Sequence, residues 1–507
     1  MSHWIIAPIV VPAMTAALIV LFLRHHPSLA RVFSVAGALL VLGIAAALLF
    51  AASRGPAEMY ALGNWPAPFG IVLVLDRLSA LMVLLTSVLG VTGLLYALSG
   101  WDERGPHFHA LWQFQLMGIN GAFLTGDLFN LFVFFEILLI ASYGLLLHGA
   151  GRERLKAGLH YVMINLVGST LFLIGVGLIY GVTGTLNMAD LIQKVPLATG
   201  GDAALLKTGG LVLLVVFGLK AALVPIHLWL PSAYANAPAP VAALFAIMTK
   251  VGVYSIIRVY TMIFGAGAGE SAWLADGWLL PAALVTMAVG AAGVLASRTL
   301  ARMVAFALLA STGTLMTAVS LFTAKSLTGA LYYLIHSTLT SAALFLIVDL
   351  IARRRGPHGD MVSVAPRFAL AEVLSVLFLL GAIATAGMPP LSGFIGKLLI
   401  LDGARDSAAA VWIWALILIT SLILIMGFAR AGSRLFWKSA AQEGFIETPP
   451  VPRQSLALAA AALPLAAMVA VTVAAGPVTH YLAGLADQLF DPAAYSAAVL
   501  GAAGETP

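Results

Sequence analysis

The chain has 507 residues, of which 61% are hydrophobic and 9% are charged. Because about 25% of the residues of a soluble domain are charged, this composition excludes an ordinary soluble protein and predicts an all-α polytopic membrane protein. The absence of cysteine excludes disulfides, thiolate-bound clusters and cysteine nucleophiles in this chain, and the net charge of +5 comes from short loops beside helix ends, a pattern that sets membrane topology rather than binding nucleic acid.

In chain order, the sequence contains fourteen mainly apolar stretches of the length that a membrane-spanning helix needs, roughly 20 residues. The expected spans are 4–23, 32–52, 71–98, 107–126, 128–147, 157–181, 207–230, 239–264, 273–295, 300–322, 326–352, 367–401 (interrupted), 410–432 and 454–476. The first stretch lacks a basic region ahead of it and is longer than the apolar part of a signal peptide, so we expect it to be retained as a helix.

The distribution of Lys and Arg between the loops predicts the orientation of the chain. Odd-numbered loops hold sixteen of the 26 basic residues and even-numbered loops hold five. Since basic residues accumulate in cytoplasmic loops, we expect the odd loops to be cytoplasmic and both termini to be external, in a bacterial inner membrane. An acidic tail containing Asp487, Asp491 and Glu505 suits an external C-terminus.

Five basic residues fall inside the expected spans. Arg77 and Arg258 are near external helix ends, where a long side chain reaches the interface, so we interpret both as topology anchors. Lys220, Lys250 and Lys397 are each bracketed by apolar residues, and a lysine at the centre of a membrane helix costs roughly 2.5–3.5 kcal/mol. Three such costs indicate a functional role.

Glu136 is a lone carboxylate in the middle of the fifth span, "LFNLFVFFEILLIASYG". Burial favours a neutral lysine amine, whereas a nearby carboxylate favours the ammonium form, so a lysine subject to both gains or loses a proton when its partner moves. Arginine stays protonated and is unsuited to this task. His336, in the eleventh span near Thr338, Thr340 and Ser341, titrates closest to physiological pH, and we expect it to join the same relay.

Two spans are interrupted next to these lysines. Pro225 disrupts the seventh span between Lys220 and His227, and "AGMPPLSG" (386–393) disrupts the twelfth before Lys397. Lipid cannot satisfy the freed backbone groups, and broken helices in corresponding parts of two halves are typical of an internally repeated transporter. His227 either lines the ion path or bonds a freed carbonyl.

Structural interpretations compete with these functional ones. An ion pair with Glu136 also explains any one of the lysines. The helix dipole explains Asp76 and Asp127, which stand at helix starts, and a position at the membrane interface explains His148. The segment "GFIGKLL" lacks the first glycine and the Ser or Thr of a phosphate-binding loop, so nucleotide binding is not supported. We expect no cofactor and no metal.

Three separated motifs carry a resemblance to a known family. The run "LKAALVPIHLWLPSAYANAPAPVAALFAIMTKVGVYSIIR" (219–258) closely resembles the proton-translocating antiporter-like membrane subunits shared by respiratory complex I and the Mrp-type multisubunit cation/proton antiporters. The segments 128–146 and 386–401 look like the motifs of that family's fifth and twelfth helices, and the similarity runs from about residue 76 to residue 434.

The resemblance implies fourteen helices, two inverted five-helix repeats and broken helices 7 and 12. It implies a division into 1–106 (helices 1–3), 107–264 (first repeat), 265–435 (second repeat) and 436–507 (helix 14 and tail). It also implies that the residues chosen above match the family's proton-relay positions. These are Glu136, Lys220, Lys250, His336 and Lys397.

Four features narrow the resemblance. Ser341 stands where many relatives have a lysine one turn after the histidine, which puts more weight on His336 and water, and Ser232 stands where complex I relatives often have Asp. Lys397 stands where the M-type subunit of complex I has glutamate, which disfavours that subunit. The length of 507 residues disfavours the largest subunits of the family, which carry a long C-terminal extension. The amino-acid sequence of the matching segments is most similar to the D-type branch of the Mrp (Pha or Mnh) antiporters.

The sequence therefore predicts a transport protein, not an enzyme, that carries protons in an Na⁺(or K⁺)/H⁺ antiporter. Its expected partners are other subunits of the complex, the lipid bilayer, protons and Na⁺ or K⁺. Two alternatives stay open: a proton-pumping component of a redox complex, distinguished by the neighbouring genes, and a scaffold without transport, in which neutralising a buried lysine lowers the yield of complex in proportion to lost activity.

Overall fold

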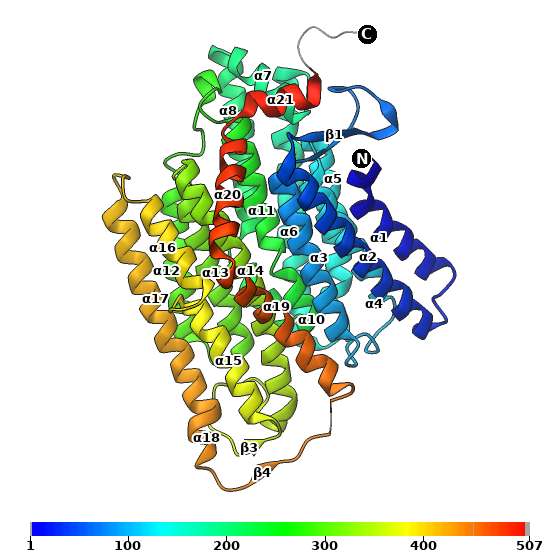
Figure 1. Ribbon diagram of the computed structural model, residues 1–507, viewed down its shortest axis with the longest axis vertical. Helices are drawn as coiled ribbons and strands as arrows, with labels where there is room; N and C mark the ends of the chain where they lie inside the picture. The colour runs from blue at the N-terminus through cyan, green and yellow to red at the C-terminus, as the bar shows by residue number, and fades with distance from the viewer. Residues whose placement is uncertain (1–2, 450, 502–507) are drawn as a thin grey trace.

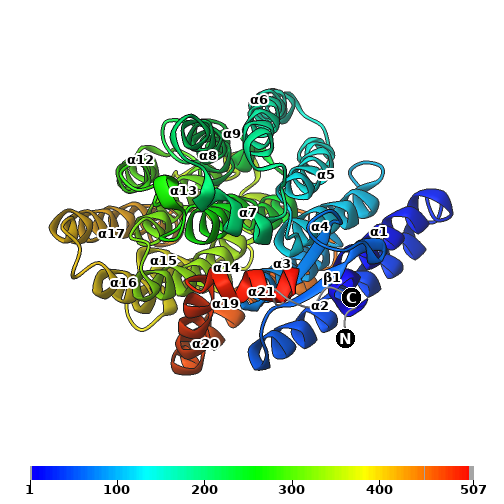
Figure 2. The same ribbon diagram turned by 90° about the horizontal axis from the view of Figure 1, so that it is seen from above.

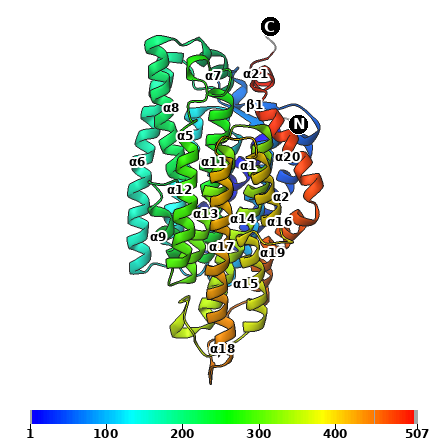
Figure 3. The ribbon, with the colours of Figure 1, turned by 90° about the vertical axis from the view of Figure 1, so that its left-hand side faces the viewer.

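The computed structural model describes residues 3–449 and 451–501, and most of its helices run along one common axis (Figures 1 and 3). The start of helix α1 and the last helix, α21, lie toward the same end of the molecule (Figure 1). Residues 1–2, 450 and 502–507, including Glu505 of the expected acidic tail, lie outside the described residues. The chain is a multi-pass membrane protein, with apolar side chains both in its core and on its exposed faces.

The first half of the chain forms long helices joined by short connections and one hairpin. Its elements are α1 (His3–Leu21), α2 (Pro27–Arg54), β1 (Glu58–Ala61), β2 (Val72–Leu75), α3 (Arg77–Ala97), α4 (Phe108–Leu124), α5 (Leu128–Leu147), α6 (Arg152–Thr183), α7 (Met188–Lys194), α8 (Gly200–Ala221), α9 (Trp229–Asn236), α10 (Ala239–Phe245) and α11 (Met248–Arg258). A π-helical turn over Val259–Ile263 extends α11.

The second half repeats the pattern of long helices. Its elements are α12 (Leu279–Ala296), α13 (Leu300–Val319), α14 (Ala324–Arg354), β3 (Arg367–Phe368), α15 (Ala371–Ala386), α16 (Ser392–Gly403), α17 (Ala410–Gly432), α18 (Lys438–Ala440), β4 (Phe445–Ile446), α19 (Gln454–Val473), α20 (Ala475–Leu489) and α21 (Pro492–Leu500). Strands β1 and β2 pair antiparallel, and β3 and β4 pair parallel.

Twelve helical segments of the described chain are long and apolar enough to cross a membrane. The expected fourth span corresponds to α4, which has 17 residues, and the expected twelfth is divided between α15 and α16. The count of fourteen, the inverted repeats and the domain boundaries therefore stay predictions. The third spanning helix begins later than predicted, because Val72–Leu75 forms β2 and Asp76 caps the helix that follows.

Two helices occupy the centre of the bundle and carry two of the predicted relay residues. Nearly all residues of α14 are buried, and every residue from Ala239 to Ile263 is buried. In the view from above, α14 lies between α5 and α6 on one side and α16 and α17 on the other (Figure 2). A path across the molecule from α5 to α16 therefore passes through its most enclosed region.

Candidate functional site

The five predicted relay residues lie on five different helices. Glu136 is on α5, Lys220 is in the last turn of α8, Lys250 is on α11, His336 is on α14 and Lys397 is on α16. The four basic side chains are buried, with at most 8% of each residue exposed, whereas Glu136 is half-buried. No two of the five form a hydrogen bond or an ion pair with each other.

Lys220 is held by a neutral amide. Its Nζ atom donates to Asn165 Oδ1 of α6 at 2.8 Å and lies 5.7 Å from the centre of the Phe135 ring on α5. Glu136, the residue after Phe135, instead accepts a hydrogen bond from Ser169 of α6. Lys220 and Glu136 therefore do not form the ion pair that the structural interpretation required.

The break after Lys220 satisfies its freed backbone groups through neighbouring side chains. Ala222 takes a left-handed conformation at φ 59°, the indole Nε1 of Trp229 donates to Leu219 O at 3.1 Å, and Val224 N donates to Thr286 Oγ1 at 2.9 Å. His227 lies inside this break, and its buried Nδ1 atom has no hydrogen-bond partner within residues 3–449 and 451–501. Both roles considered for His227 stay open.

Lys250 is the most isolated of the three lysines. It is fully buried, and the only hydrogen bond of its ammonium within the described ranges is to the neighbouring Thr249 Oγ1 at 3.3 Å. A small cavity of about 10 Å³ is lined by Lys220 together with Met248 and Val251, which are near Lys250 in sequence. That volume is at the lower limit for one water molecule.

His336 and Lys397 each contact a residue at an edge of the second helix break. His336 Nδ1 is 2.9 Å from Ser392 Oγ, at the start of α16. Lys397 donates to Ala386 O, the last residue of α15, at 2.9 Å, and to Ser421 Oγ of α17 at 2.8 Å. The ammonium thus satisfies a carbonyl that the break has freed.

Gly387 allows this contact. It has φ +77°, a conformation that favours glycine, and a β-carbon at this position would lie 2.7 Å from Lys397 Cδ. The break and the lysine that the sequence places near each other are therefore in contact at α15 and α16.

Of the hydroxyls near His336, Thr338 Oγ1 donates to Leu334 O of its own helix, and Thr340 Oγ1 is buried without a partner among the described residues.

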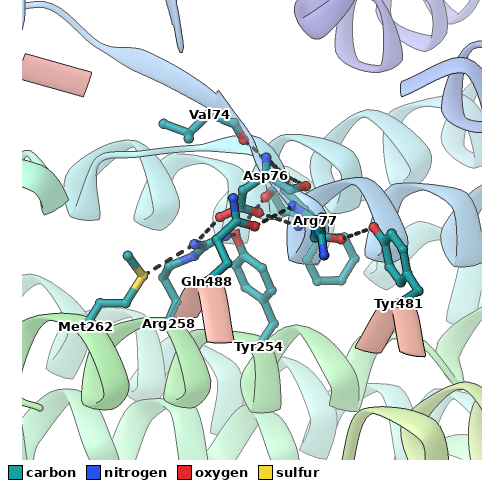
Figure 4. Close-up of polar contacts among 10 residues, drawn as sticks. Val74, Asp76, Arg77, Tyr254, Arg258, Met262, Tyr481 and Gln488 are labelled. Atoms are coloured by element: carbon teal, nitrogen blue, oxygen red, sulfur yellow. Dashed lines mark hydrogen bonds and ion pairs between the residues drawn. The ribbon is translucent and has the colours of Figure 1, made fainter. Parts of the chain in front are cut away.

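Arg258 is not a snorkelling anchor, contrary to the sequence interpretation. Its guanidinium donates to the carboxylate of Asp76 and, at 3.2 Å, to the hydroxyl of Tyr254, and both ion-pair partners are 2% exposed (Figure 4). Helix packing brings the cation to an acid, so the side chain has no need to reach the interface. Arg77 remains near the end of its helix, where its backbone N–H donates to Gln488 and its carbonyl accepts from Tyr481 (Figure 4).

Both aspartates expected at helix starts are N-caps. The side chain of Asp76 accepts from Ser79 N at 2.8 Å in a reciprocal capping box, and that of Asp127 accepts from Asn130 N at 2.8 Å. Asp76 thus has two roles, because the same carboxylate caps α3 and pairs with Arg258 on α11.

Several polar residues of the site were missed by sequence reasoning. Asn165 and Ser169 lie in the expected sixth span, and Asn165 was a detectable signal, since a buried amide in an apolar span needs a partner. Asp349, near the end of α14, was also detectable. Its carboxylate accepts from Tyr96 at 2.6 Å, from Trp101 at 3.0 Å and from Arg353 at 2.8 Å, which ties α3 to α14.

Comparison with known proteins shows to which family the chain is similar. Residues 125–424 match the family described as NADH:quinone oxidoreductase/Mrp antiporter, TM. The chain is 42% identical to the D-type subunit of a probable K⁺/H⁺ antiporter of Rhizobium meliloti, over 99% of this chain and 98% of the relative. It is 38% identical to the D-type subunit of an Na⁺/H⁺ antiporter of Bacillus subtilis, over 86% and 87%. These relatives are named as transporters, not as enzymes.

Solved structures show the same fold. A chain of the Mrp complex from Dietzia sp. DQ12-45-1b superposes with a TM-score of 0.85 at 28% identity, covering 99% of this chain and all of that one. A chain of the membrane-bound sulfane sulfur reductase, an archaeal respiratory membrane complex, superposes with a TM-score of 0.88 at 25% identity, with the same coverage.

Proposed function

Because the chain belongs to the NADH:quinone oxidoreductase/Mrp antiporter family, we propose that it is the proton-translocating subunit of a hetero-oligomeric antiporter that exchanges Na⁺ or K⁺ for protons across a bacterial inner membrane. The names of its relatives include both K⁺/H⁺ and Na⁺/H⁺ antiporters, so both cations belong to the proposal. The other subunits of such a complex are its partners.

One observation carries the proposal: none of the three buried lysines pairs with a carboxylate of the described residues. Lys220 is bonded to an amide, Lys250 to a hydroxyl and Lys397 to a carbonyl and a hydroxyl. A buried lysine in a tight ion pair would keep its proton, whereas neutral acceptors leave the ammonium and amine forms closer in energy. Residues in this condition can load and release protons.

The proposed relay runs across the bundle rather than straight through it. Protons enter near Glu136 and Lys220, pass Lys250 and His336 in the buried centre, and leave by Lys397. The broken helices next to Lys220 and Lys397 support this role, since irregular backbone at membrane depth is found where it lines a hydrated path or is buried in protein. Water bridges the links that have no direct hydrogen bond.

Coupling to the cation is electrostatic in this proposal. When charge on or near Glu136 moves, the stability of the Lys220 ammonium changes, and each proton transfer changes the field at the next residue. Among the described residues, no group of three or more His, Cys, Asp or Glu side chains is arranged to hold a metal ion. In this proposal the proton moves through this chain and is driven by a cation that moves in a neighbouring subunit.

Replacement of Lys220 by alanine tests the function. The complete set of antiporter subunits is expressed in a bacterium lacking its own exchangers, and cation-driven proton movement is followed in inverted membrane vesicles with a fluorescent pH probe. We expect Lys220→Ala to abolish exchange while the subunits still copurify in normal amounts. Lys207→Ala is the matched control, because Lys207 lies on the same helix and makes no side-chain hydrogen bond or ion pair within the described ranges.

Normal exchange by assembled Lys220→Ala complex rejects the relay. A loss of exchange that parallels a loss of complex supports the scaffold alternative instead. The high TM-score with a subunit of the archaeal respiratory membrane complex supports a second candidate function, that of a proton-pumping component of a redox complex. Genes for quinone-reducing or iron–sulfur subunits beside this one, together with failure of the isolated operon to exchange cations for protons, favour that candidate.

A further inference from the structure

A groove between α15 and α17 opens to the outside of the bundle. The two helices pack against each other and run together toward the end of the molecule at which α18 lies (Figures 1 and 3). The groove has a volume of about 690 Å³, which is within the range of ligand-binding pockets, roughly 300–1,000 Å³. Val376 and Leu379, which line it, are exposed, and none of the five predicted relay residues lines it.

The sequence forms this groove with large and small side chains at helical spacing. Lining residues recur every four positions, at Phe378, Ala382 and Ala386 on α15 and at Phe428, Gly432 and Phe436 on α17 and the π-helical turn Ser433–Trp437. Residues four apart lie on the same face of a helix, so each helix presents one continuous face to the groove. The Phe378 ring packs 6.0 Å from the Phe428 ring and 5.9 Å from the Phe436 ring, while the alanines and the glycine leave the space open.

The groove is as deep as one leaflet of a bilayer. On α15 its lining extends from Ser375 to Ala386, and at about 1.5 Å of rise per residue this stretch is about 16 Å long. The hydrocarbon core of a bilayer is about 30 Å thick, so one leaflet contributes about 15 Å. A spanning helix of a partner subunit needs contact along the whole core. The depth therefore fits an acyl chain that enters from one side of the membrane.

Aromatic and basic side chains lie at one end of the groove. Trp437 is 83% exposed and lines both the groove and a neighbouring hollow that Lys438 also lines. Phe436 is shared in the same way with a hollow that is lined by Arg367 and Glu372. Among the described residues that line the groove and the two hollows, Glu372 is the single carboxylate. Tryptophan is typical of the headgroup level of a membrane, and two cations against one carboxylate favour an anionic headgroup there.

The other end of the groove reaches the second helix break. Ala386 and Met388, on either side of Gly387, both line it. The carbonyl oxygen of Ala386 accepts from Lys397 Nζ at 2.9 Å. An apolar occupant of the groove packs against the break and keeps water away from it on the membrane side.

We propose that this groove binds one acyl chain of an anionic phospholipid, with the phosphate beside Lys438 and Arg367 and the end of the chain against the break at Ala386. The lining carries one net positive charge, and each basic residue near an anionic headgroup is worth about fivefold in binding. We therefore expect about a fivefold preference for an anionic lipid over a zwitterionic one. This inference goes beyond the proposed function and does not depend on it.

Photo-crosslinking in vesicles tests the site. The complete antiporter complex is reconstituted in phosphatidylcholine containing a small fraction of phosphatidylglycerol that carries a diazirine near the end of one acyl chain, and labelled peptides are identified by mass spectrometry. We expect label at Ile383, Ala386 and Ile425, above the label on the exposed face of α6 at Leu166 and Val167. The same diazirine on phosphatidylcholine should label the groove about fivefold less.

Two variants test the two halves of the lipid separately. Lys438→Gln removes one cation, and the preference for phosphatidylglycerol should fall by about fivefold. Arg152→Gln is the matched control, because both side chains are exposed and neither makes a side-chain hydrogen bond or ion pair within the described ranges. Ala429, an exposed residue of the groove, is replaced by phenylalanine to fill the space for the acyl chain. Label from both lipids should then disappear from the groove while the complex is recovered in normal amounts.

Three results overturn the site. Equal labelling by the two lipids, or equal labelling of the groove and of α6, means that only unspecific surrounding lipid is present. Unchanged labelling in Ala429→Phe means that the acyl chain is elsewhere. Because the chain has no cysteine of its own, Ala429→Cys gives it a single thiol. If the groove stays unlabelled and this thiol crosslinks to another subunit, a partner subunit is the occupant and the lipid site is wrong. Exchange is not measured in any of these experiments, so their failure is distinguishable from normal exchange by Lys220→Ala, which rejects the proposed function.

Discussion

Replacing Arg258 with methionine removes the cation from a buried ion pair and leaves the acid behind. Asp76 and Arg258 are each 2% exposed, and their side chains are in direct contact at the end of α11 (Figure 4). Removing one partner of a buried pair typically costs about 3–5 kcal/mol, because the remaining charge has lost its compensation. Methionine keeps an unbranched side chain in place of the aliphatic stem of arginine, without the charged head.

The structure places the expected loss at the lower end of this range. In Arg258→Met the carboxylate of Asp76 still accepts from Ser79 N at 2.8 Å, which compensates part of the charge. We therefore expect a loss of about 3 kcal/mol. Adding Asp76→Asn removes the stranded charge and retains an N-cap residue, since asparagine caps helices as well as aspartate does. The double variant should return to within roughly 1 kcal/mol of the wild type.

Unfolding of the purified protein in mixed micelles, with increasing fractions of denaturing detergent, measures these differences. The three variants and the wild type form a double-mutant cycle, in which direct interaction appears as non-additivity. If Arg258→Met unfolds like the wild type, or if the losses of the two single variants simply add in the double variant, then the pair does not stabilise the fold and our reasoning is refuted.

Three further outcomes are expected. Gly387→Ala places a β-carbon 2.7 Å from Lys397 Cδ and strains a residue at φ +77°, so cation-dependent proton movement in vesicles should fall at least as far as in Lys397→Ala. Ser392→Ala removes the 2.9 Å partner of His336 Nδ1, and exchange should fall by up to roughly tenfold, the equivalent of one net hydrogen bond. Burial lowers the pKa of the His148 imidazole, although its hydrogen bond to a backbone carbonyl has the opposite effect. The unfolded chain therefore binds a proton at His148 more tightly than the folded chain does. The stability contribution is complete above about pH 6.5 and is lost as the pH falls below it, and His148→Gln should flatten that loss in melting curves.

Two of the three predictions have a matched control variant. Gly177→Ala adds a methyl group at an exposed position of α6 with no atom within 4 Å, and exchange should be unchanged. Ser392→Thr keeps the hydroxyl and should restore exchange. Normal exchange in Gly387→Ala or Ser392→Ala contradicts the geometry given for Lys397 and His336, and an unaltered acid sensitivity in His148→Gln contradicts the sign worked out above.

Local signals identified the parts of this protein that depend on one stretch of chain. Hydropathy located the spanning helices, and prolines and glycines located the breaks at 222–228 and 387–391. The insertion cost of a buried lysine singled out Lys220, Lys250 and Lys397, which are all buried in the structure. Asp127 as a cap was also predictable, because capping involves only the next few residues.

Partners of the buried charges were not predictable in the same way. Arg258 looked like an interfacial anchor because it lies near a helix end, but α3 brings Asp76 against it. Lys220 and Glu136 are the obvious pair from composition, yet α6 supplies a neutral partner to the first and a hydroxyl to the second. Sequence alone does not say which of several polar groups a side chain meets.

The amino-acid sequence by itself determined that this chain is a helical membrane protein of the antiporter family, which segments span, where two of them break and that Lys220, Lys250 and Lys397 are buried. Those properties follow from the transfer free energy of each residue and from backbone chemistry, both of which are local. Only the tertiary structure decided that the lysines contact neutral oxygens rather than carboxylates, because that choice depends on which helices pack together and on the rotation of each about its own axis.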